Sequence, residues 1–230
     1  MLKDPVIQKR FLEYLEGFIT ENKRMLFDKV IEQRTRHITV VLEDIYQSQN
    51  ASAVLRSCDC FGVQDVHIIE NRYEYSINPD VALGSTKWLN LQKYNTEDEN
   101  TQACYKNLRE QGYQIIATTP HKDDLLLDEL DVSRKTALVF GTELEGLSVT
   151  AIEQADAWVK IPMYGFTESF NISVSAAIIL WHLTGKLRKS DIPWQLNDAE
   201  RIETRLQWAL SVVKHPDKHK RAFLIREGLG

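Results

Sequence analysis

The middle of the chain places a strand, a loop between two glycines and a helix start in direct succession: residues 136–154 read TALVFGTELEGLSVTAIEQ. The apolar run 136–140 predicts a buried strand, and residues 147–154 predict a short helix. Gly141 and Gly146 enclose the loop between them, at the position where α/β proteins bind ligands. This stretch therefore indicates an α/β fold with a ligand site directly after a strand.

Strand and helix patterns alternate on both sides of this stretch. Short apolar runs predict the strands, and apolar residues at helical spacing predict the helices between them. The expected strands are 37–45, 66–69, 114–117, 136–140 and 157–161, and the expected helices are 50–61, 99–111, 147–154 and 171–187. Strands separated by such helices form βαβ units, so we predict a parallel sheet with helices on both faces.

Helical patterns also flank this α/β body at both ends. Residues 5–18 and 21–36 predict a helical hairpin, and residues 197–214 predict an amphipathic helix that a basic tail follows. The expected domains are an N-terminal helical extension at 1–36, the α/β domain at 37–190, and a C-terminal helix with its tail at 191–230.

The composition excludes several classes of protein. A hydrophobic fraction of 43% over 230 residues supports a buried core. Three cysteines are too few for a disulfide framework, and Cys58-x-Cys60 has neither zinc-site nor thioredoxin-type spacing, so we expect reduced thiols and no metal. The start, MLKDPVIQKR, carries no apolar signal segment, and the longest apolar run, near 174–181, is too short to cross a bilayer. We therefore expect a cytoplasmic protein that is neither secreted nor inserted into a membrane.

The net charge of −5 is unevenly distributed along the chain. Residues 1–36 hold eight Lys and Arg against six Asp and Glu, and residues 214–226 hold five against one. Residues 37–213, in contrast, hold fifteen against twenty-five. Basic ends on an acidic body predict that a polyanion would be held by the terminal segments. The alternative is that the ends are solvated helices with ordinary charge scatter.

The loop between Gly141 and Gly146 has the glycine spacing of a phosphate-binding P-loop. However, Leu147 stands where a P-loop has lysine, and the carboxylates of Glu143 and Glu145 would repel a polyphosphate. A G-x-G-x-x-G fingerprint after the first strand is also missing, which argues against a dinucleotide site. The loop suits a cationic or neutral ligand; alternatively, it is a turn whose glycines adopt positive φ, with Ser148 as a helix N-cap.

Two other loops carry polar residues at predicted helix starts. Asn171 precedes an apolar helix, where it is a helix cap or, alternatively, holds a ribose or phosphate oxygen. Asn50 and Arg56 are six residues apart and so do not share a helix face, but Asn50 in the preceding loop could converge with Arg56 on one ligand. The alternative for Arg56 is a surface ion pair.

Taken in order, these segments give residues 37–187 a resemblance to a known family. They are Asn50…Arg56…Phe61-Gly62, LVFGTELEGLS at 138–148, and IPM at 161–163 followed by SFNISVSAA at 169–177. The chain resembles the SpoU family of RNA ribose 2′-O-methyltransferases, within the SPOUT superfamily. With a helical extension at each end, it is most similar to the members that methylate guanosine 18 in the D-loop of tRNA.

The resemblance implies a fold, a cofactor and a reaction. The fold is a parallel sheet with helices on both faces and a deep trefoil knot in its C-terminal part, and the enzyme is a homodimer whose interface helps to build the site. S-adenosyl-L-methionine is the implied cofactor, and its methyl group is transferred to a ribose 2′-OH. The family pattern implies that Arg56 acts at this hydroxyl, and that Asn50, Glu143, Ser169 and Asn171 arrange Arg56, the ribose and the phosphate.

The implied cofactor site consists of backbone groups and apolar side chains from three loops. Its expected residues are Thr118, Thr119, Pro120, Gly141, Thr142, Glu143, Gly146, Leu147, Ile161, Met163, Ser169, Phe170 and Asn171. Glu145 departs from the residue types that relatives often carry in this loop and makes the expected site more acidic.

We expect tRNA to be bound by the terminal segments. The residues expected to contact it are Lys9, Arg10, Arg24, Arg34, Arg36, Lys214, Lys218, Lys220 and Arg221. Three alternatives stay open: a SpoU-family enzyme that methylates ribosomal RNA or another tRNA position, a non-catalytic RNA-binding module of the same fold, and a metabolic Rossmann enzyme. The short N-terminal hairpin favours tRNA, and the missing nucleotide fingerprints argue against the last alternative.

Overall fold

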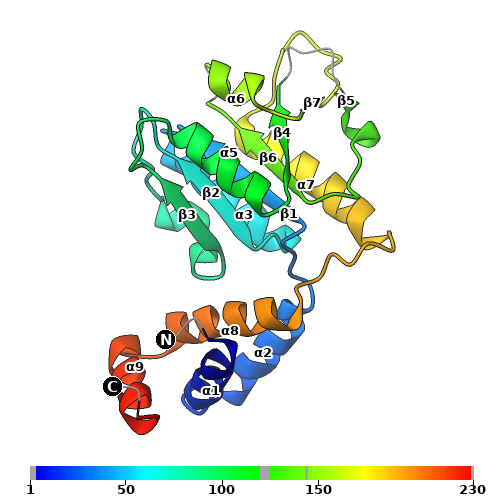
Figure 1. Cartoon of the computed structure of the whole chain (residues 1–230). Helices are drawn as coiled ribbons and strands as arrows, with labels where there is room; N and C mark the ends of the chain where they lie inside the picture. The colour runs from blue at the N-terminus through cyan, green and yellow to red at the C-terminus, as the bar shows by residue number, and fades with distance from the viewer. Residues whose placement is uncertain (1–3, 120–124, 143–144, 229–230) are drawn as a thin grey trace. The chain divides into compact units, whose positions relative to one another are not determined.

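The computed structural model describes residues 4–119, 125–142 and 145–228 (Figure 1). The chain divides into two compact units, one formed by residues 1–34 together with 195–230 and the other by residues 35–194. We call the first the helical unit and the second the sheet unit. The helical unit contains α1 (Pro5–Glu16), α2 (Glu21–Ile31), α8 (Asp198–Val212) and α9 (Pro216–Arg226).

The sheet unit alternates strands and helices along the chain. Its first half contains β1 (Ile38–Glu43), α3 (Ser48–Phe61), β2 (Asp65–Ile69), α4 (Pro79–Ala82), the 3-10 turn η1 (Ser85–Lys87), β3 (Asn90–Tyr94) and α5 (Asn100–Glu110). Its second half contains β4 (Gln114–Thr118), β5 (Leu125–Leu126), the 3-10 turn η2 (Leu127–Glu129), β6 (Thr136–Phe140), α6 (Val149–Glu153), β7 (Ala157–Lys160) and α7 (Ile172–Arg188).

The strands form one sheet, which within the described residues has seven strands in the order β3-β2-β1-β6-β4-β7-β5. Every neighbouring pair is parallel, which confirms the predicted α/β class. Strand β4 lies between β6 and β7, although β6 and β7 both follow it in the sequence. The carboxyl ends of these three strands therefore meet at one edge of the sheet, and this arrangement places the candidate site.

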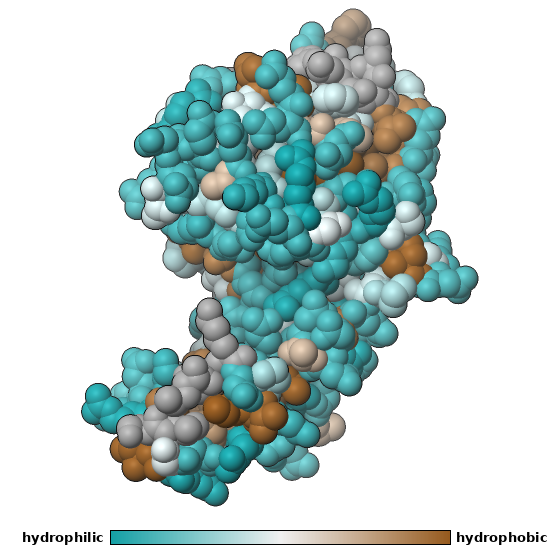
Figure 2. All heavy atoms as spheres, in the orientation of Figure 1, coloured by the Kyte–Doolittle hydropathy of each residue, from teal (hydrophilic) through white to brown (hydrophobic). Residues whose placement is uncertain are grey.

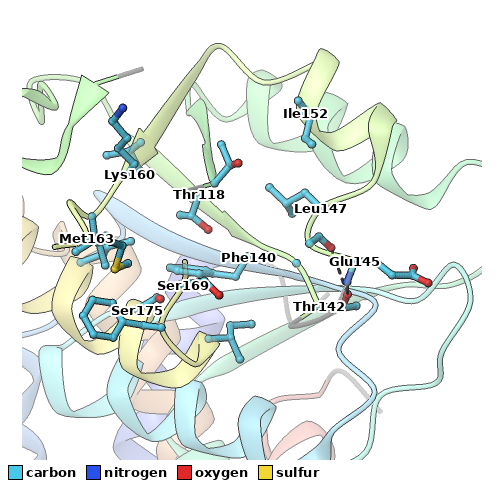
Figure 3. Close-up of a pocket in the computed structure, with 18 residues that line it drawn as sticks. Thr118, Phe140, Thr142, Glu145, Leu147, Ile152, Lys160, Met163, Ser169 and Ser175 are labelled. Atoms are coloured by element: carbon cyan, nitrogen blue, oxygen red, sulfur yellow. Dashed lines mark hydrogen bonds between the residues drawn. The ribbon is translucent and has the colours of Figure 1, made fainter. Parts of the chain in front are cut away.

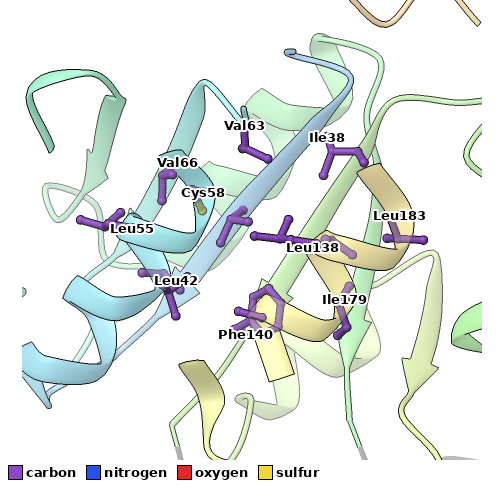
Figure 4. Close-up of a cluster of buried hydrophobic side chains, with 14 of the residues drawn as sticks. Ile38, Leu42, Leu55, Cys58, Val63, Val66, Leu138, Phe140, Ile179 and Leu183 are labelled. Carbon is purple, nitrogen blue, oxygen red and sulfur yellow. The ribbon is translucent and has the colours of Figure 1, made fainter. Parts of the chain in front are cut away.

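Successive residues of the central strands bury opposite faces of the sheet, because side chains alternate along a strand. Leu138 and Phe140 of β6 belong to a core with α3 and α7 on one face, shown in Figure 4. Ala137 and Val139 belong to a second core with α5 and α6 on the other face. Both faces are thus covered, as the continuous apolar runs predict.

The predicted helix boundaries are confirmed where a capping residue defines them. Gly62 ends α3 with φ of 80°, a left-handed conformation that glycine adopts without a steric penalty. Ser148 caps α6 by accepting a hydrogen bond from the backbone N–H of Ala151. Asn171 caps α7 by accepting one from Ser173. Both capping residues lie in loops that the sequence singled out for chemistry.

Three regular elements lie in segments for which the sequence analysis predicts neither a strand nor a helix. Strand β3 falls within residues 71–97, where its half-exposed and polar sequence NLQKY gives no apolar run because it lies at the sheet edge. The two-residue strand β5 is too short to give a pattern. The basic tail contains helix α9, which Phe223 anchors by stacking on Phe11 with ring centroids 4.7 Å apart.

The helical unit has its own core, formed by helices from both ends of the chain. Trp208 of α8 is buried and lies 5.4 Å from the ring of Phe27 of α2, measured between centroids. The guanidinium of Arg205 pairs with both Glu16 and Asp28, which joins α8 to α1 and α2. The N-terminal and C-terminal extensions thus pack on each other within one unit.

The surface in the view of Figure 2 is largely hydrophilic, with separate hydrophobic patches. Within the part of the chain that the structure describes, none of the helices is both long enough and apolar enough to cross a membrane.

Candidate functional site

A cavity of about 210 Å³ opens at the carboxyl ends of β4, β6 and β7 (Figure 3). Thr118 and Thr119 line it at the end of β4, Phe140 at the end of β6, and Val159 at β7. The loop after β7 and the first turns of α7 complete the wall. Because β4 separates β6 from β7 in the sheet, three loops that are distant in sequence face one space.

The loop after β6 closes on itself and needs glycine at both ends. Thr142 and Gly146 exchange two backbone hydrogen bonds, of 2.9 and 3.0 Å between N and O. A Cβ atom on Gly141 would lie 2.2 Å from the carbonyl oxygen of Gly146, so a larger residue would force the loop apart. Gly146 has φ of +71°. The glycines are therefore explained by close backbone approach at Gly141 and by positive φ at Gly146.

The first and third sequence motifs meet through two asparagine side chains. The Nδ2 of Asn171 donates a hydrogen bond of 3.2 Å to the Oδ1 of Asn50, across 121 residues of sequence. The Oδ1 of Asn171 at the same time accepts from the backbone and hydroxyl of Ser173. Asn171 is therefore a helix cap, as one of its two predicted roles requires, and it also joins the first motif to the third.

Most residues expected at the cofactor site line this cavity. They are Thr118, Thr119, Gly141, Thr142, Gly146, Leu147, Ile161, Met163, Ser169 and Phe170. Asn171 does not line it but follows Phe170 directly. Pro120 and Glu143 lie outside the described residues.

Arg56 lies apart from the cavity within a single chain. Its side chain is on the exposed side of α3 and is absent from the cavity wall, whereas Asn50, at the start of the same helix, contacts Asn171. The two residues are six positions apart and point to different sides of the helix, as their spacing predicts. The expected convergence of Arg56 and Asn50 is therefore not formed within the single chain.

Sequence reasoning missed part of the wall. The further lining residues are Phe140, Glu145, Ile152, Val159, Lys160, Ile172, Ser175 and Ile179. Helical periodicity could have found three of them, because Ile172, Ser175 and Ile179 share one face of α7. Val159 and Lys160 directly precede the motif residue Ile161 at the end of the predicted strand 157–161. Their position at a strand end could have identified them as lining residues.

Glu145 is paired with an arginine from the segment that follows β2. Its carboxylate accepts a hydrogen bond of 2.6 Å from Arg72, whose Nε lies 3.4 Å from Asp44. The hydrogen bond to Glu145, followed by that to Asp44, raises the pKa of Arg72 above its ordinary value. Glu145 and Lys160 are the ionisable side chains among the described residues of the wall, and Arg72 offsets the charge of Glu145.

Two of the predicted RNA-binding cations are not available at the surface. Arg34 is only 1% exposed and lies over the ring of Trp208, 5.4 Å from its centroid. Arg36 is largely buried and pairs with Asp65 at 3.1 Å. The run of charges at 34–36 gave no sign of this, because burial depends on residues distant in sequence. The remaining predicted cations are exposed: Lys9, Arg10, Arg24, Lys214, Lys218, Lys220 and Arg221.

Comparison with known proteins agrees with this geometry. The sequence profile of the SpoU rRNA Methylase family matches residues 37–181. The tRNA (guanosine(18)-2′-O)-methyltransferase of Borreliella burgdorferi is 44% identical over 214 residues, which cover 93% of this chain and 95% of that protein.

Solved structures also share the fold. The TrmH/SpoU tRNA modifying enzyme of A. aeolicus superposes with a TM-score of 0.74 at 30% identity, over 84% of this chain and 98% of that one. The SpoU methyltransferase AviRb from Streptomyces viridochromogenes, crystallised in complex with the cofactor AdoMet, superposes with a TM-score of 0.58 at 20% identity, over 70% and 62% of the two chains. The profile match covers more than half of the chain, and it includes all three sequence motifs. The chain therefore belongs to the SpoU methylase family.

Proposed function

We propose that this protein transfers a methyl group from S-adenosylmethionine to the ribose 2′-OH of guanosine 18 in tRNA. The observation that carries the proposal is the meeting of the second and third motifs around one cavity at the carboxyl ends of β4, β6 and β7, together with the hydrogen bond that joins Asn50 of the first motif to Asn171. The specificity for guanosine 18 is supported by the B. burgdorferi enzyme, which is similar over nearly the whole of both chains.

The described residues of the cavity fit this donor. Leu147, Ile161 and Ile152 provide an apolar wall suited to an adenine ring. A cationic sulfonium is compatible with the carboxylate of Glu145 in the wall. When bound, the donor would supply an electrophilic methyl group on sulfur.

The protein must hold the 2′-oxygen beside that methyl group and assist the loss of its proton. Positioning alone is worth up to about 7–11 kcal/mol in the most favourable intramolecular reactions. The amides of Asn50 and Asn171, which contact each other beside the cavity, are placed to orient a ribose. Arg56 acts at the hydroxyl: its cationic guanidinium stabilises the developing alkoxide, or acts through a phosphate that accepts the proton.

We further propose that the enzyme is a homodimer, because Arg56 does not line the cavity of its own chain. Helix α7 has two exposed apolar residues that suit an interface, Val174 and Trp181, the latter 68% exposed. Ile179 and Leu183 of the same helix are used in the core. A second copy packed on this helix would complete the site.

We also extend to this chain the deep trefoil knot that the family resemblance implies, in the C-terminal part of the sheet unit. We propose a cytoplasmic location, where tRNA is available and free thiols such as Cys58 and Cys104 stay reduced. The exposed cations of the helical unit would bind the tRNA backbone.

The test is to incubate the protein with methyl-labelled S-adenosylmethionine and, in separate reactions, bulk tRNA and ribosomal RNA, and then to map the labelled ribose. Label on guanosine 18 of tRNA is the expected result. Label on ribosomal RNA or another tRNA position would overturn the specificity, and binding of tRNA without any transfer would indicate a non-catalytic module.

A further inference from the structure

The loop after β6 is fixed from outside the cavity by a set of hydrogen-bonded side chains, which we call the brace. The brace consists of Glu43, Asp44, Arg72, Glu145 and Ser148. Glu43 is the last residue of the central strand β1, and Asp44 follows it directly. Two adjacent carboxylates therefore connect the loop to the middle of the sheet.

Glu43 holds the end of the loop. Its buried carboxylate accepts hydrogen bonds from the backbone N–H of Ser148 at 2.9 Å and from the Ser148 hydroxyl at 2.8 Å. It also accepts from the hydroxyl of Thr101 on α5 at 2.6 Å. Ser148 is the N-cap of α6, so Glu43 fixes the point at which the loop becomes a helix.

Asp44 and Arg72 hold the middle of the loop. Asp44 is buried and has φ of +53°, a conformation that is uncommon for a residue other than glycine. Its Oδ1 accepts hydrogen bonds from the backbone N–H of Asn71 at 2.7 Å and of Arg72 at 2.9 Å. The Arg72 side chain then extends to Glu145, so a buried carboxylate in a strained backbone orients the arginine that holds the loop.

The loop needs this support because it has open space on both sides. Glu145 and Leu147 line the cavity described above and also a second hollow of about 440 Å³ between the loop and residues 98–101. The segment that contains them is therefore the partition between two spaces. Without the brace, the partition could move outward and widen the cavity.

From this geometry we propose that Arg72 is a positioning residue, which fixes the wall of the donor cavity through Glu145. The proposal rests on the proposed function, because it assigns that cavity to S-adenosylmethionine. Arg72 does not line the donor cavity, so its effect on the donor must pass through the loop. It predicts that loss of Arg72 weakens donor binding and leaves the affinity for tRNA unchanged.

The experiment is a double-mutant cycle with Arg72→Ala, Glu145→Ala and the double variant. The dissociation constant of S-adenosylhomocysteine, a non-reactive analogue of the donor, is measured by calorimetry. Arg72 and Glu145 form an exposed ion pair, whose contribution is small, so we expect Arg72→Ala to raise this constant up to about fivefold. In the protein that already carries Glu145→Ala, adding Arg72→Ala should not raise the dissociation constant further. Arg72→Lys keeps the positive charge, but lysine cannot bind Asp44 and Glu145 at the same time with the planar geometry of a guanidinium. This variant should therefore recover part of the affinity for S-adenosylhomocysteine.

Arg109→Ala is the matched control, because Arg109 forms a comparably exposed ion pair with Asp156 and lines neither space. It should leave the dissociation constant unchanged. In steady-state assays Arg72→Ala should raise KM for the donor, with kcat and KM for tRNA at wild-type values. An unchanged dissociation constant in Arg72→Ala, or an equal change in both backgrounds, would overturn the proposal.

Amide hydrogen exchange of residues 145–150 in the free protein separates this proposal from the proposed function. Faster exchange in Arg72→Ala, but not in Arg109→Ala, is the expected result whatever ligand the cavity takes, and equal exchange rates in the two variants would overturn the brace. If the wild-type protein bound no S-adenosylhomocysteine, the proposed function would fail, and the exchange rates alone would decide whether Arg72 holds the loop.

Discussion

The sheet unit and the helical unit differ in where they place their charge. The sheet unit holds fourteen Lys and Arg against twenty-two Asp and Glu, whereas the helical unit holds fourteen against eleven. The sheet unit concentrates its chemistry in a small cavity at three strand ends. The helical unit offers exposed cations on helices that pack through an aromatic core.

The net charge of the whole chain therefore does not predict which ligands its separate units bind. The pI near 5.7 argues against a nucleic-acid ligand, but the acidic residues that lower it belong mostly to the sheet unit. If the two units divide the work, changes in the sheet unit should affect the methyl transfer, and changes in the helical unit should affect the affinity for RNA.

The largest effect is expected from Arg56→Ala in the sheet unit. Removal of one group that stabilises charge in a transition state typically costs about 10²–10³-fold in rate. Because Arg56 is exposed and away from the cavity, thermal stability and donor binding should not change. Single-turnover methylation with saturating donor is the measurement, and a near-normal rate would remove Arg56 from the mechanism.

A smaller effect is expected from Gly141→Ala, which tests the shape of the cavity wall. The new Cβ would meet the carbonyl of Gly146, and overpacking of this kind costs about 1–3 kcal/mol. We therefore expect donor binding to weaken about 10–100-fold, since about 1.4 kcal/mol corresponds to a factor of ten. Calorimetry with S-adenosylhomocysteine measures this.

Gly185→Ala is the control for this change, because nothing lies within 4 Å of a Cβ at that position. It should keep or slightly raise the stability, since alanine is favoured over glycine within a helix. Equal donor affinity in the two variants would show that the close approach at Gly141 does not shape the site.

Asn171→Ser separates the capping of α7 from the contact with Asn50, and it should lower the methylation rate by up to about tenfold. Serine caps helices about as well as asparagine, so the free energy of unfolding should stay within about 0.5 kcal/mol of wild type. The contact from Nδ2 to Asn50 is lost, and a hydrogen bond of this kind is worth about 0.5–1.5 kcal/mol, which sets a rate reduction of up to about tenfold. Stability is measured by denaturant unfolding and the rate by single-turnover methylation; a loss of stability with a normal rate would leave only the capping role.

The smallest effect on chemistry is expected from Lys218→Gln with Lys220→Gln in the helical unit. These exposed residues lie on α9, which Phe223 anchors to Phe11. Substituting the two lysines keeps this packing, whereas deleting the tail would remove it. Loss of two phosphate contacts should lower the slope of log K against log salt concentration by about 1.4–1.8.

The slope is measured by tRNA binding at several salt concentrations, and kcat at saturating tRNA should not change. The matched control is Lys87→Gln with Lys106→Gln on the surface of the sheet unit, which should keep the wild-type slope. Equal slopes in the two double variants would break the proposed division between the units.

The parallel α/β fold class could be predicted from local sequence patterns. The same patterns identified the loops that carry the three motifs and the residues that cap the neighbouring helices. These features depend on short-range patterns: apolar runs for β1 and β6, helical spacing for α3 and α7, and Gly62, Ser148 and Asn171 at helix ends. Such patterns act over a few residues, so they can be recognised without knowledge of the rest of the chain.

Which of these parts meet follows from the folded chain and not from local patterns. The tertiary structure placed β4 between β6 and β7, buried Arg34 against Trp208, and paired Arg72 with Glu145 across 73 residues of sequence. It also left Arg56 outside the wall of the cavity in its own chain. The physical reason is that strand order and side-chain partners depend on packing between segments distant in sequence, which local patterns do not specify.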